Sequence, residues 1–298
     1  MDYLYKAIQK EMGVALPEQP PQVEPEERPA AQFAVAASAV VPEMPSIATP
    51  LETPLTFTAS MGGARSVEFP MKSERLYCQR AGKMSRGQRH ALEQIRVLRS
   101  RVLEMTRSQN IHSLMVTSAV AGEFKTTTSI NLALALSQVQ GVRVCLVDTD
   151  MRKAGIADAL GIAYERGLHD YLQDTAPIGK VLLRLTESLC LVPSGGTDEN
   201  SAEILHSETM ASLVQELKKA FDLVIYDAPP LFPVADARIL ANLVDGALFC
   251  VRAGHTPDSI IQEAMELIRP KVMGAVLVGA DVNSSGWYYY EHKASGKE

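Results

Sequence analysis

The chain has 298 residues, of which 46% are hydrophobic, 21% charged and 6% aromatic, and its formal net charge is -6. This composition is typical of a soluble globular protein, and no apolar run approaches the roughly 18 to 20 residues that a membrane span requires. The first residues show no secretory signal. The acidic balance argues against a general nucleic-acid binder, so we expect no nucleic-acid partner.

The prolines divide the chain into two unlike regions. Nine of the 17 prolines lie in residues 1–60, one is Pro70, and the next is Pro177. Residues 14–84 are rich in Pro, Ala, Glu and Ser and lack a helical or strand period, which predicts a disordered, semi-extended linker. Residues 1–13 carry a short helical pattern. An isolated helix of this length is marginal in water, so this segment either orders on a partner or the main domain, or is a frayed terminus.

Helical and strand-like patterns alternate from residue 85 onward. Helices are predicted at 85–107, 129–140, 209–220 and 258–268. Apolar runs at 113–117, 142–147, 189–192, 223–226, 247–251 and 275–278 predict strands. Continuous apolar strands with intervening helices indicate an α/β fold of three layers, in which a mostly parallel sheet is covered on both faces. Ligands of such folds bind at the carboxyl ends of the strands.

The first predicted strand leads into the segment SAVAGEFKTTTSINLALALS. A strand, a loop ending in Lys-Thr and an amphipathic helix are typical of a P-loop NTPase, in which backbone N–H groups and the helix N-terminus bind phosphate. Lys125 is expected to neutralise phosphate, and Thr126 to bind Mg²⁺ through its hydroxyl. The nucleotide would contact Ala121, Gly122, Glu123, Phe124, Lys125, Thr126 and Thr127. The alternative for so degenerate a motif is a solvated loop lysine.

The degeneracy of this loop lies at two positions. The P-loop consensus has glycine where this chain has Ala119 and Phe124. Glycine before the lysine lets the backbone curl around phosphate, often at dihedrals that other residues avoid. If Phe124 adopts a left-handed conformation, the strain is roughly 1 to 2 kcal/mol. We expect this strain to weaken nucleotide binding about ten-fold without abolishing it.

Three aspartates follow apolar strands and are expected at one edge of the sheet. Asp148 and Asp150 lie in VCLVDTDMR, and Asp227 ends LVIYD. Side chains alternate along an extended segment, so Asp148 and Asp150 can point to one side. Together with Lys125 and Thr126, these carboxylates predict a Mg²⁺–nucleotide site. Strand-end aspartates also serve as helix caps, which is the alternative interpretation.

These motifs resemble those of the bacterial tyrosine kinases of capsule and exopolysaccharide synthesis, P-loop ATPases related to chromosome-partitioning and septum-positioning proteins. The resemblance covers about two-thirds of the chain, residues 86–281. The Walker A motif is matched imperfectly by residues 119–126, the Walker A′ motif (an apolar run, then D-x-D-x-R) fully by 144–152, and Walker B by 223–227. The stretch YDAPPLFPVADARILANLVDGALFCVRAG also looks like the segment that follows Walker B in this family.

The resemblance implies an ATP-dependent tyrosine autokinase that uses ATP and Mg²⁺. It assigns catalysis to Lys125, Asp148 and Asp150, and Mg²⁺ ligation, directly or through water, to Thr126, Asp150 and Asp227. Asp148 would act as a base on the incoming tyrosine hydroxyl, whose ordinary pKa of about 10 makes such help necessary. Arg152 would aid phosphate positioning. The kinase domain would span residues 85–282.

Two outlying features extend the resemblance. Glu93, Arg96 and Arg99 match an E-x-x-R-x-x-R motif through which family members contact one another in a ring. These charges align on one helix face, for which an ordinary solvated surface is the alternative. The tail, residues 283–298, contains Tyr288, Tyr289 and Tyr290, which match the tyrosines that such kinases autophosphorylate. The alternative is that these aromatic residues dock on the domain or on a partner.

The resemblance also implies partners and a location. A membrane-bound chain-length regulator would activate the kinase through its cytoplasmic tail, and hold it in the cytoplasm at the inner face of the plasma membrane. Phosphates on successive tyrosines would repel one another and loosen a homo-oligomeric ring. One alternative is a nucleotide-binding regulator with weak or lost kinase activity. Another is a partitioning or septum-positioning ATPase, ranked last because no lysine lies between Ala119 and Phe124.

Overall fold

The computed structural model describes residues 33–34, 65–66, 86–198 and 200–280. The predicted helix at the start of the chain, nearly all of the predicted linker, and the tyrosine-bearing tail lie outside the described residues. The described part of the linker consists of two strands of two residues each, β1 (Phe33–Ala34) and β2 (Arg65–Ser66). Neither strand was predicted, because two residues are too few to show a strand period.

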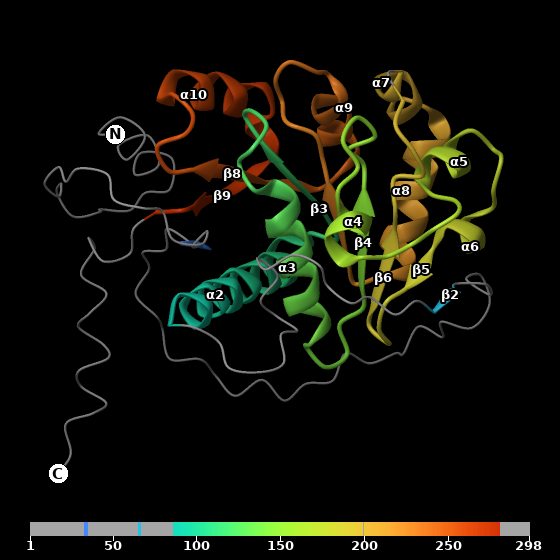
Figure 1. Ribbon diagram of the computed structural model, residues 1–298, viewed down its shortest axis with the longest axis horizontal. Coiled ribbons are helices and arrows are strands. Elements are labelled where there is room, and N and C mark those ends of the chain that lie inside the picture. Colours follow the sequence, from blue (N-terminus) through green and yellow to red (C-terminus); the bar gives the residue numbers. More distant parts are fainter. Residues whose placement is uncertain (1–32, 35–64, 67–85, 199, 281–298) are drawn as a thin grey trace, which may run out of the picture.

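Within the described residues, nine strands form one sheet in the order β1-β9-β8-β3-β7-β4-β6-β5-β2 (Figure 1). The strands that follow β2 are β3 (Ser113–Ser118), β4 (Val144–Asp148), β5 (Leu183–Arg184), β6 (Leu189–Val192), β7 (Leu223–Asp227), β8 (Gly246–Arg252) and β9 (Val272–Val278). The six from β9 to β6 run parallel and are the six predicted strands. β1 lies antiparallel to β9, and β5 antiparallel to β6.

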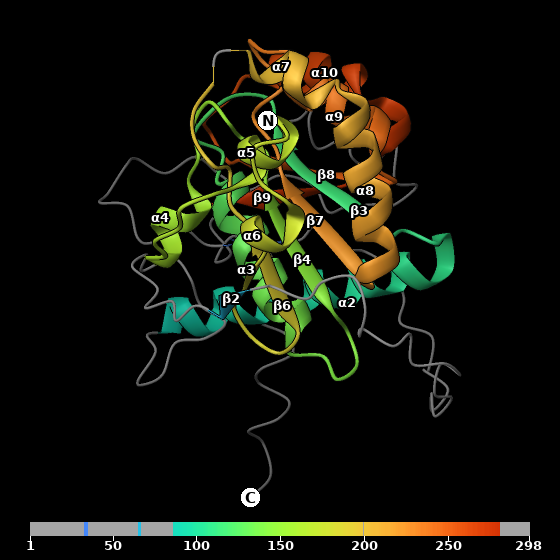
Figure 2. The ribbon, with the colours of Figure 1, turned by 90° about the vertical axis from the view of Figure 1, so that its right-hand side faces the viewer.

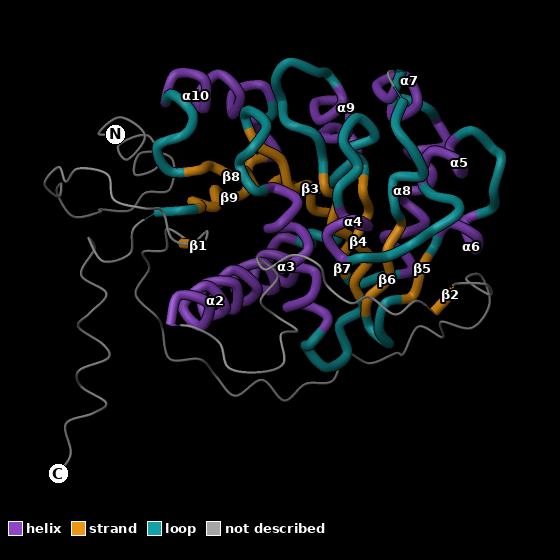
Figure 3. The backbone as a smooth tube through the Cα atoms, in the orientation of Figure 1, coloured by secondary structure: helices purple, strands orange, loops and turns teal. Residues whose placement is uncertain are grey.

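Helices connect most of these strands (Figure 3). They are α2 (Arg86–Gln109), α3 (Lys125–Ser137), α4 (Ile156–Leu160), α5 (Leu168–Leu172), α6 (Ile178–Val181), α7 (Ser201–Leu205), α8 (Glu208–Ala220), α9 (Asp236–Leu243), α10 (Asp258–Leu267) and the 3₁₀-helix η1 (Arg269–Lys271). The helix predicted from residue 129 begins four residues earlier, because the run of threonines after Lys125 lacks the apolar period that marks a helix in sequence. No described helix combines the length and the apolar character needed to cross a bilayer.

The helices cover both faces of the sheet (Figure 2). One core joins the sheet to α2 and α3, through residues such as Ile95, Leu98 and Ile130. A second core, on the opposite face, joins the sheet to α7, α8, α9 and α10, through residues such as Leu213 and Leu240. The predicted three-layer fold is therefore confirmed. Burial of the apolar helix faces stabilises such a fold by roughly 25 cal/mol for each Å² of apolar surface removed from water. This burial is the main source of its stability.

The strand register brings the polar ends of the central strands together. Asp148, the last residue of β4, lies opposite Asp227, the last residue of β7. On its other side Asp227 lies opposite Val116, two residues before the end of β3, after which the loop leads into α3. The predicted phosphate loop and the predicted aspartates therefore share one edge of the sheet.

Candidate nucleotide site

The loop between β3 and α3 has the geometry of a phosphate-binding loop. Gly122 has φ 88° and Phe124 has φ 61°, so the backbone turns sharply before the helix begins at Lys125. No acidic residue lies in the first turn of α3. The unpaired N–H groups at a helix N-terminus and the helix dipole favour an anion there. Residues 121–127, predicted to bind nucleotide, all lie in this loop and first turn.

Phe124 has the left-handed conformation, with φ 61° and ψ 25°, on which the predicted strain depends. Its ring packs beside the core under α2 and α3, and the Arg252 guanidinium lies 5.1 Å from its centroid. Its carbonyl accepts the N–H and the hydroxyl of Thr128, each at 2.9 Å. These contacts belong to the folded loop itself, so the strain of roughly 1 to 2 kcal/mol falls on folding. The weakening of nucleotide binding stays a prediction. Because the strain is already present in the folded loop, it gives less reason to expect weaker binding.

A loop that follows β8 braces the phosphate loop. Glu123 is fully buried, and its carboxylate accepts the Ala119 N–H at 3.1 Å and the Thr256 hydroxyl at 2.7 Å. His255 Nε2 lies 3.3 Å from the Ala121 carbonyl oxygen. The Glu123 carboxylate, predicted within the nucleotide-binding set, is thus used inside the loop. Sequence reasoning missed these bracing residues, whose only signal was their place after the carboxyl end of an apolar strand.

Lys125 lies among the three predicted aspartates. Its Nζ donates to Asp150 Oδ2 at 2.6 Å, and its side chain is 12% exposed. Burial lowers the lysine pKa, but the charges of Asp227, Asp150 and Asp148 prevail and raise it above its ordinary value. The lysine is therefore positively charged, and the structure brings it together with the three predicted aspartates.

Asp148 is held by backbone donors on both of its oxygens. Oδ1 accepts the Asp150 N–H at 3.3 Å, and Oδ2 accepts the Gly155 and Ile156 N–H groups at 3.2 Å each. Burial raises the pKa of Asp148, with the charge of Asp227 adding to it, and the backbone donors oppose this, so the pKa is about 7. Asp148 thus orders the start of α4, as the capping alternative predicted, and has the pKa of a group that exchanges protons near neutral pH.

Asp227 carries a buried oxygen without a partner. Oδ1 accepts the Ser129 hydroxyl at 2.9 Å, whereas Oδ2 has no hydrogen-bond partner within the described residues. Burial raises the pKa of Asp227, and Lys125 and the neighbouring Thr126 and Ser129 hydroxyls lower it, with burial prevailing. An unpaired buried acceptor destabilises a fold by about 1 to 3 kcal/mol, so such an atom calls for an explanation.

The unpaired oxygen fits a divalent cation. Mg²⁺ prefers oxygen ligands, keeps several waters, and is usually bound through one or two carboxylates together with substrate phosphates. The carboxylates of Asp227 and Asp150 and the hydroxyl of Thr126 supply donors of this kind beside the phosphate loop. The donor set therefore suits Mg²⁺ in chemistry and in number.

Arg152, the last residue of the predicted A′ motif, contacts a helix that packs on the face of the sheet opposite α3. Its Nε and Nη2 donate to Asp236 Oδ2 and Oδ1 at 3.3 Å each, in the first turn of α9. The Ser201 hydroxyl, at the start of α7, also donates to Asp236. Sequence reasoning missed Asp236 and Ser201. The predicted role of Arg152 in positioning phosphate stays a prediction.

The three charged residues of the predicted ring motif lie along α2. Glu93 and Arg96 form an ion pair with each other on the exposed face of the helix. Arg99 donates from Nη1 to the Ala135 carbonyl of α3 at 3.5 Å. The spacing therefore serves contacts within the chain, and a ring contact stays a prediction.

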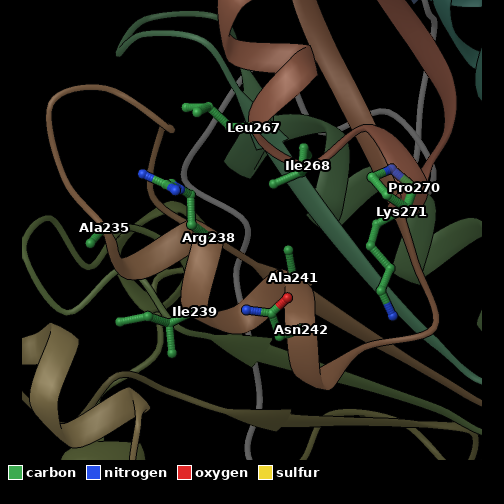
Figure 4. Close-up of a pocket in the computed structure, with 9 residues that line it drawn as sticks. All are labelled: Ala235, Arg238, Ile239, Ala241, Asn242, Leu267, Ile268, Pro270 and Lys271. Carbon is green, nitrogen blue, oxygen red and sulfur yellow. The ribbon is translucent and has the colours of Figure 1, made fainter.

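A separate hollow of about 430 Å³ lies between α9 and the end of α10 (Figure 4). It is lined by Ala235, Arg238, Ile239, Ala241, Asn242, Leu267, Ile268, Pro270 and Lys271. None of the predicted nucleotide-site residues is among them. The candidate site is instead the carboxyl edge of the central strands, where the titratable groups converge.

The fold and the site together place the chain in the class of P-loop nucleotide-binding domains. The family model that matches it is described as an AAA domain and covers residues 114–245. The chain is 34% identical over 202 residues to tyrosine-protein kinase YwqD of Bacillus subtilis (strain 168), an alignment that spans 66% of this chain and 85% of that protein.

Two further relatives agree with this match. The succinoglycan biosynthesis transport protein ExoP of Rhizobium meliloti (strain 1021) is 36% identical over 183 residues, which are 59% of this chain but 23% of that protein. The solved kinase domain of the Escherichia coli tyrosine kinase ETK has a TM-score of 0.62 at 26% identity, and the match covers 67% of this chain and 80% of that domain. The chain belongs to the bacterial tyrosine-protein kinase family, which confirms the resemblance inferred from its motifs.

Proposed function

We propose that the chain is an ATP-dependent protein-tyrosine autokinase that regulates exopolysaccharide or capsule polymerisation or export. The observation that carries the proposal is the buried Lys125–Asp150 ion pair, which lies at the start of α3 beside the unpaired Asp227 oxygen. A buried cation with carboxylates on one side and a helix N-terminus on the other suits a polyphosphate with its cation. Membership of the tyrosine kinase family supports the same chemistry.

Lys125 and the start of α3 bind the phosphates of ATP in this proposal. The lysine exchanges its bond with Asp150 for bonds with phosphate oxygens, which releases the Asp150 carboxylate. Asp150, Asp227 and the Thr126 hydroxyl are the groups that would hold Mg²⁺, directly or through water. When bound, Mg²⁺ neutralises charge that develops on the transferring phosphoryl group. Arg252 and the buried Glu123 keep the phosphate loop in shape.

Asp148 serves as the base for the acceptor tyrosine. A general base is most effective when its pKa lies near the working pH, and the pKa of Asp148 is about 7. Three backbone N–H groups hold its carboxylate in one orientation. The tyrosine proton passes to this carboxylate as the phenolic oxygen attacks the γ-phosphorus of ATP and ADP departs.

The acceptors are Tyr288, Tyr289 and Tyr290, phosphorylated by a neighbouring subunit in a ring. Glu93 and Arg96 lie exposed on α2, where they can exchange their mutual ion pair for contacts with a second copy. A membrane-bound regulator of chain length is the partner in this proposal, and the match to ExoP, a succinoglycan transport protein, supports a link to polysaccharide export.

A nucleotide-binding regulator with weak kinase activity is the second candidate. The observation that favours it is Phe124, a left-handed non-glycine residue directly before the phosphate-binding lysine. The P-loop consensus has glycine at this position, which adopts the left-handed conformation without strain.

The two candidates are separated by incubating the purified full chain with ATP and Mg²⁺, with and without a partner's cytoplasmic tail, and mapping phosphate by mass spectrometry. We expect phosphate on the three tail tyrosines of the unsubstituted protein and none in Lys125→Ala. Retained ATP binding without phosphate on any tyrosine, even with the partner's tail, would reject the kinase and favour the regulator. Lys218→Ala, which removes a lysine bonded to Asp245 at the other edge of the sheet, is the matched control.

A further inference from the structure

Asp236 is a fully buried carboxylate with two side-chain partners. Arg152 donates to both of its oxygens, and the Ser201 hydroxyl donates to Oδ2. A buried carboxylate is stable only when it is paired and hydrogen-bonded, and the planar guanidinium fork fits it in one orientation. The arrangement therefore fixes the direction of the Arg152 side chain, which is 35% exposed.

The fixed arginine lies at the carboxyl edge of the sheet, on the face opposite the phosphate helix. It follows Asp150 by two residues, so its backbone belongs to the predicted A′ motif. Its partners come from α9 and α7, which pack on one face of the sheet, whereas α3 packs on the other (Figure 2). Phosphoryl transfer needs the acceptor roughly in line with the leaving group, across from the bound nucleotide. Arg152 is thus held on the side of the site away from the phosphate helix.

We propose that Asp236, assisted by Ser201, is a positioning residue that holds Arg152 on the acceptor side of the site. Nε and Nη2 are engaged by Asp236, which leaves the N–H groups of Nη1 to bind an oxygen of the tyrosine-bearing segment. The ligand class is an acceptor peptide with a tyrosine and an adjacent acidic group, such as the YYYE sequence of this chain. The inference rests on the proposed kinase function and assigns Arg152 to the acceptor, not to ATP.

The chain contains a matched control pair at the opposite edge of the sheet. Arg143 donates to Asp222 with the same two nitrogens, Nε at 3.2 Å and Nη2 at 3.4 Å. Both residues precede strands at their amino ends, far along β4 and β7 from the site. Loss of this pair removes an ion pair of the same geometry without touching the acceptor side.

The test uses the full chain in a trans assay, with Lys125→Ala protein as the acceptor. The variants are Arg152→Ala, Arg152→Lys, Asp236→Asn, the double variant Arg152→Ala/Asp236→Asn, and the control Asp222→Asn. The measurements are kcat and KM for the acceptor, Kd for a fluorescent ATP analogue, and Tm. Binding of a synthetic peptide of residues 283–298, with and without phosphate on Tyr289, is measured on the same proteins.

We expect each single variant at Arg152 or Asp236 to lower kcat/KM for the acceptor about ten-fold, mainly through KM, and to change ATP Kd less than about two-fold. Arg152→Lys should not restore the rate, because an ammonium cannot reproduce the bidentate fork. The double variant should be no worse than Arg152→Ala, since both changes remove one interaction. Asp222→Asn should leave kcat/KM unchanged.

Three results would overturn the inference. If the variants at Arg152 and Asp236 lose as much affinity for ATP as for the acceptor, Arg152 contacts the nucleotide. If they lower Tm but leave kcat/KM unchanged, the Arg152–Asp236 pair is purely structural. If the unsubstituted protein transfers no phosphate, the proposed function fails while peptide binding still tests Asp236. Peptide affinity that is the same in Asp236→Asn as in the unsubstituted protein would then reject the positioning role.

Discussion

The two edges of the central sheet contain aspartates whose pKa values are shifted in opposite directions. At the amino edge, Asp245 accepts the His112 and Ser113 N–H groups at 2.9 Å each and Lys218 Nζ at 2.5 Å. Burial raises the pKa of Asp245, but these donors prevail and lower it. At the carboxyl edge, burial prevails and the pKa values of Asp148 and Asp227 are raised.

The difference separates a carboxylate that stabilises the fold from the carboxylates of the proposed nucleotide site. A fully hydrogen-bonded carboxylate favours its charged form and contributes to stability at neutral pH. A carboxylate whose burial outweighs its donors favours its neutral form, and Asp227 in addition keeps one oxygen without a hydrogen bond among the described residues. The raised pKa values of Asp148 and Asp227 agree with the position of the phosphate loop in placing the candidate site at the carboxyl edge.

The largest effect is expected from Asp227→Asn. It removes a ligand of the proposed Mg²⁺ site, so autophosphorylation should fall about 100-fold or more. The free energy of unfolding should nevertheless rise at pH 8. A raised folded-state pKa means that the unsubstituted protein loses stability as pH climbs from the unfolded-state value through the folded-state pKa, and the neutral asparagine avoids this loss. Urea unfolding at pH 8 and pH 5 measures it, and a variant less stable than the unsubstituted protein at pH 8 would contradict the comparison.

Asp245→Asn should give the opposite pattern at the amino edge. Loss of hydrogen bonds to a charged group should lower the free energy of unfolding by about 1 to 3 kcal/mol at pH 7, with autophosphorylation unchanged. A lowered pKa contributes stability above the unfolded-state value that is lost as pH falls through the folded-state pKa, so the difference from the unsubstituted protein should shrink below about pH 4. Urea midpoints across this range test it, and a loss of kinase activity at equal folding would break the division between the two edges.

Phe124→Gly should have the smallest effect. Relief of roughly 1 to 2 kcal/mol of backbone strain is offset by lost ring packing, by a cation–π contact of about 0.5 to 1 kcal/mol, and by the flexibility of glycine in the unfolded chain. We expect a stability change within about 1 kcal/mol and an ATP Kd within about three-fold of the unsubstituted value. Phe124→Asn is the matched control, since asparagine tolerates the left-handed region. Ten-fold tighter ATP binding in Phe124→Gly would instead place the strain on nucleotide binding, as the sequence suggested.

Much of the carboxyl edge was predictable because its signals are local. Apolar runs that end in Asp148 and Asp227 are buried parallel strands, and their carboxyl ends must meet at one edge. Lys125 follows a strand and precedes a helix within a few residues, so its place was readable from the chain order. The start of α3 was placed too late, because its first turn is polar and is held by the loop and the sheet.

The interactions that shape the site could not be predicted in this way. Thr256 is 133 positions from Glu123, and Asp236 is 84 positions from Arg152, so no period or spacing connects them. Such pairs exist because burial in a common core leaves a carboxylate in need of donors, and the fold decides which donors are near.

The sequence by itself determined the layered α/β fold, the order of the motifs, and the family, since each depends on residue types at short spacing. Only the tertiary structure decided which carboxylates are satisfied. The pKa of Asp148, the unpaired oxygen of Asp227 and the direction of Arg152 all depend on burial and on donors from distant segments. Desolvation acts on positions in space, and short-range patterns in a chain do not specify them.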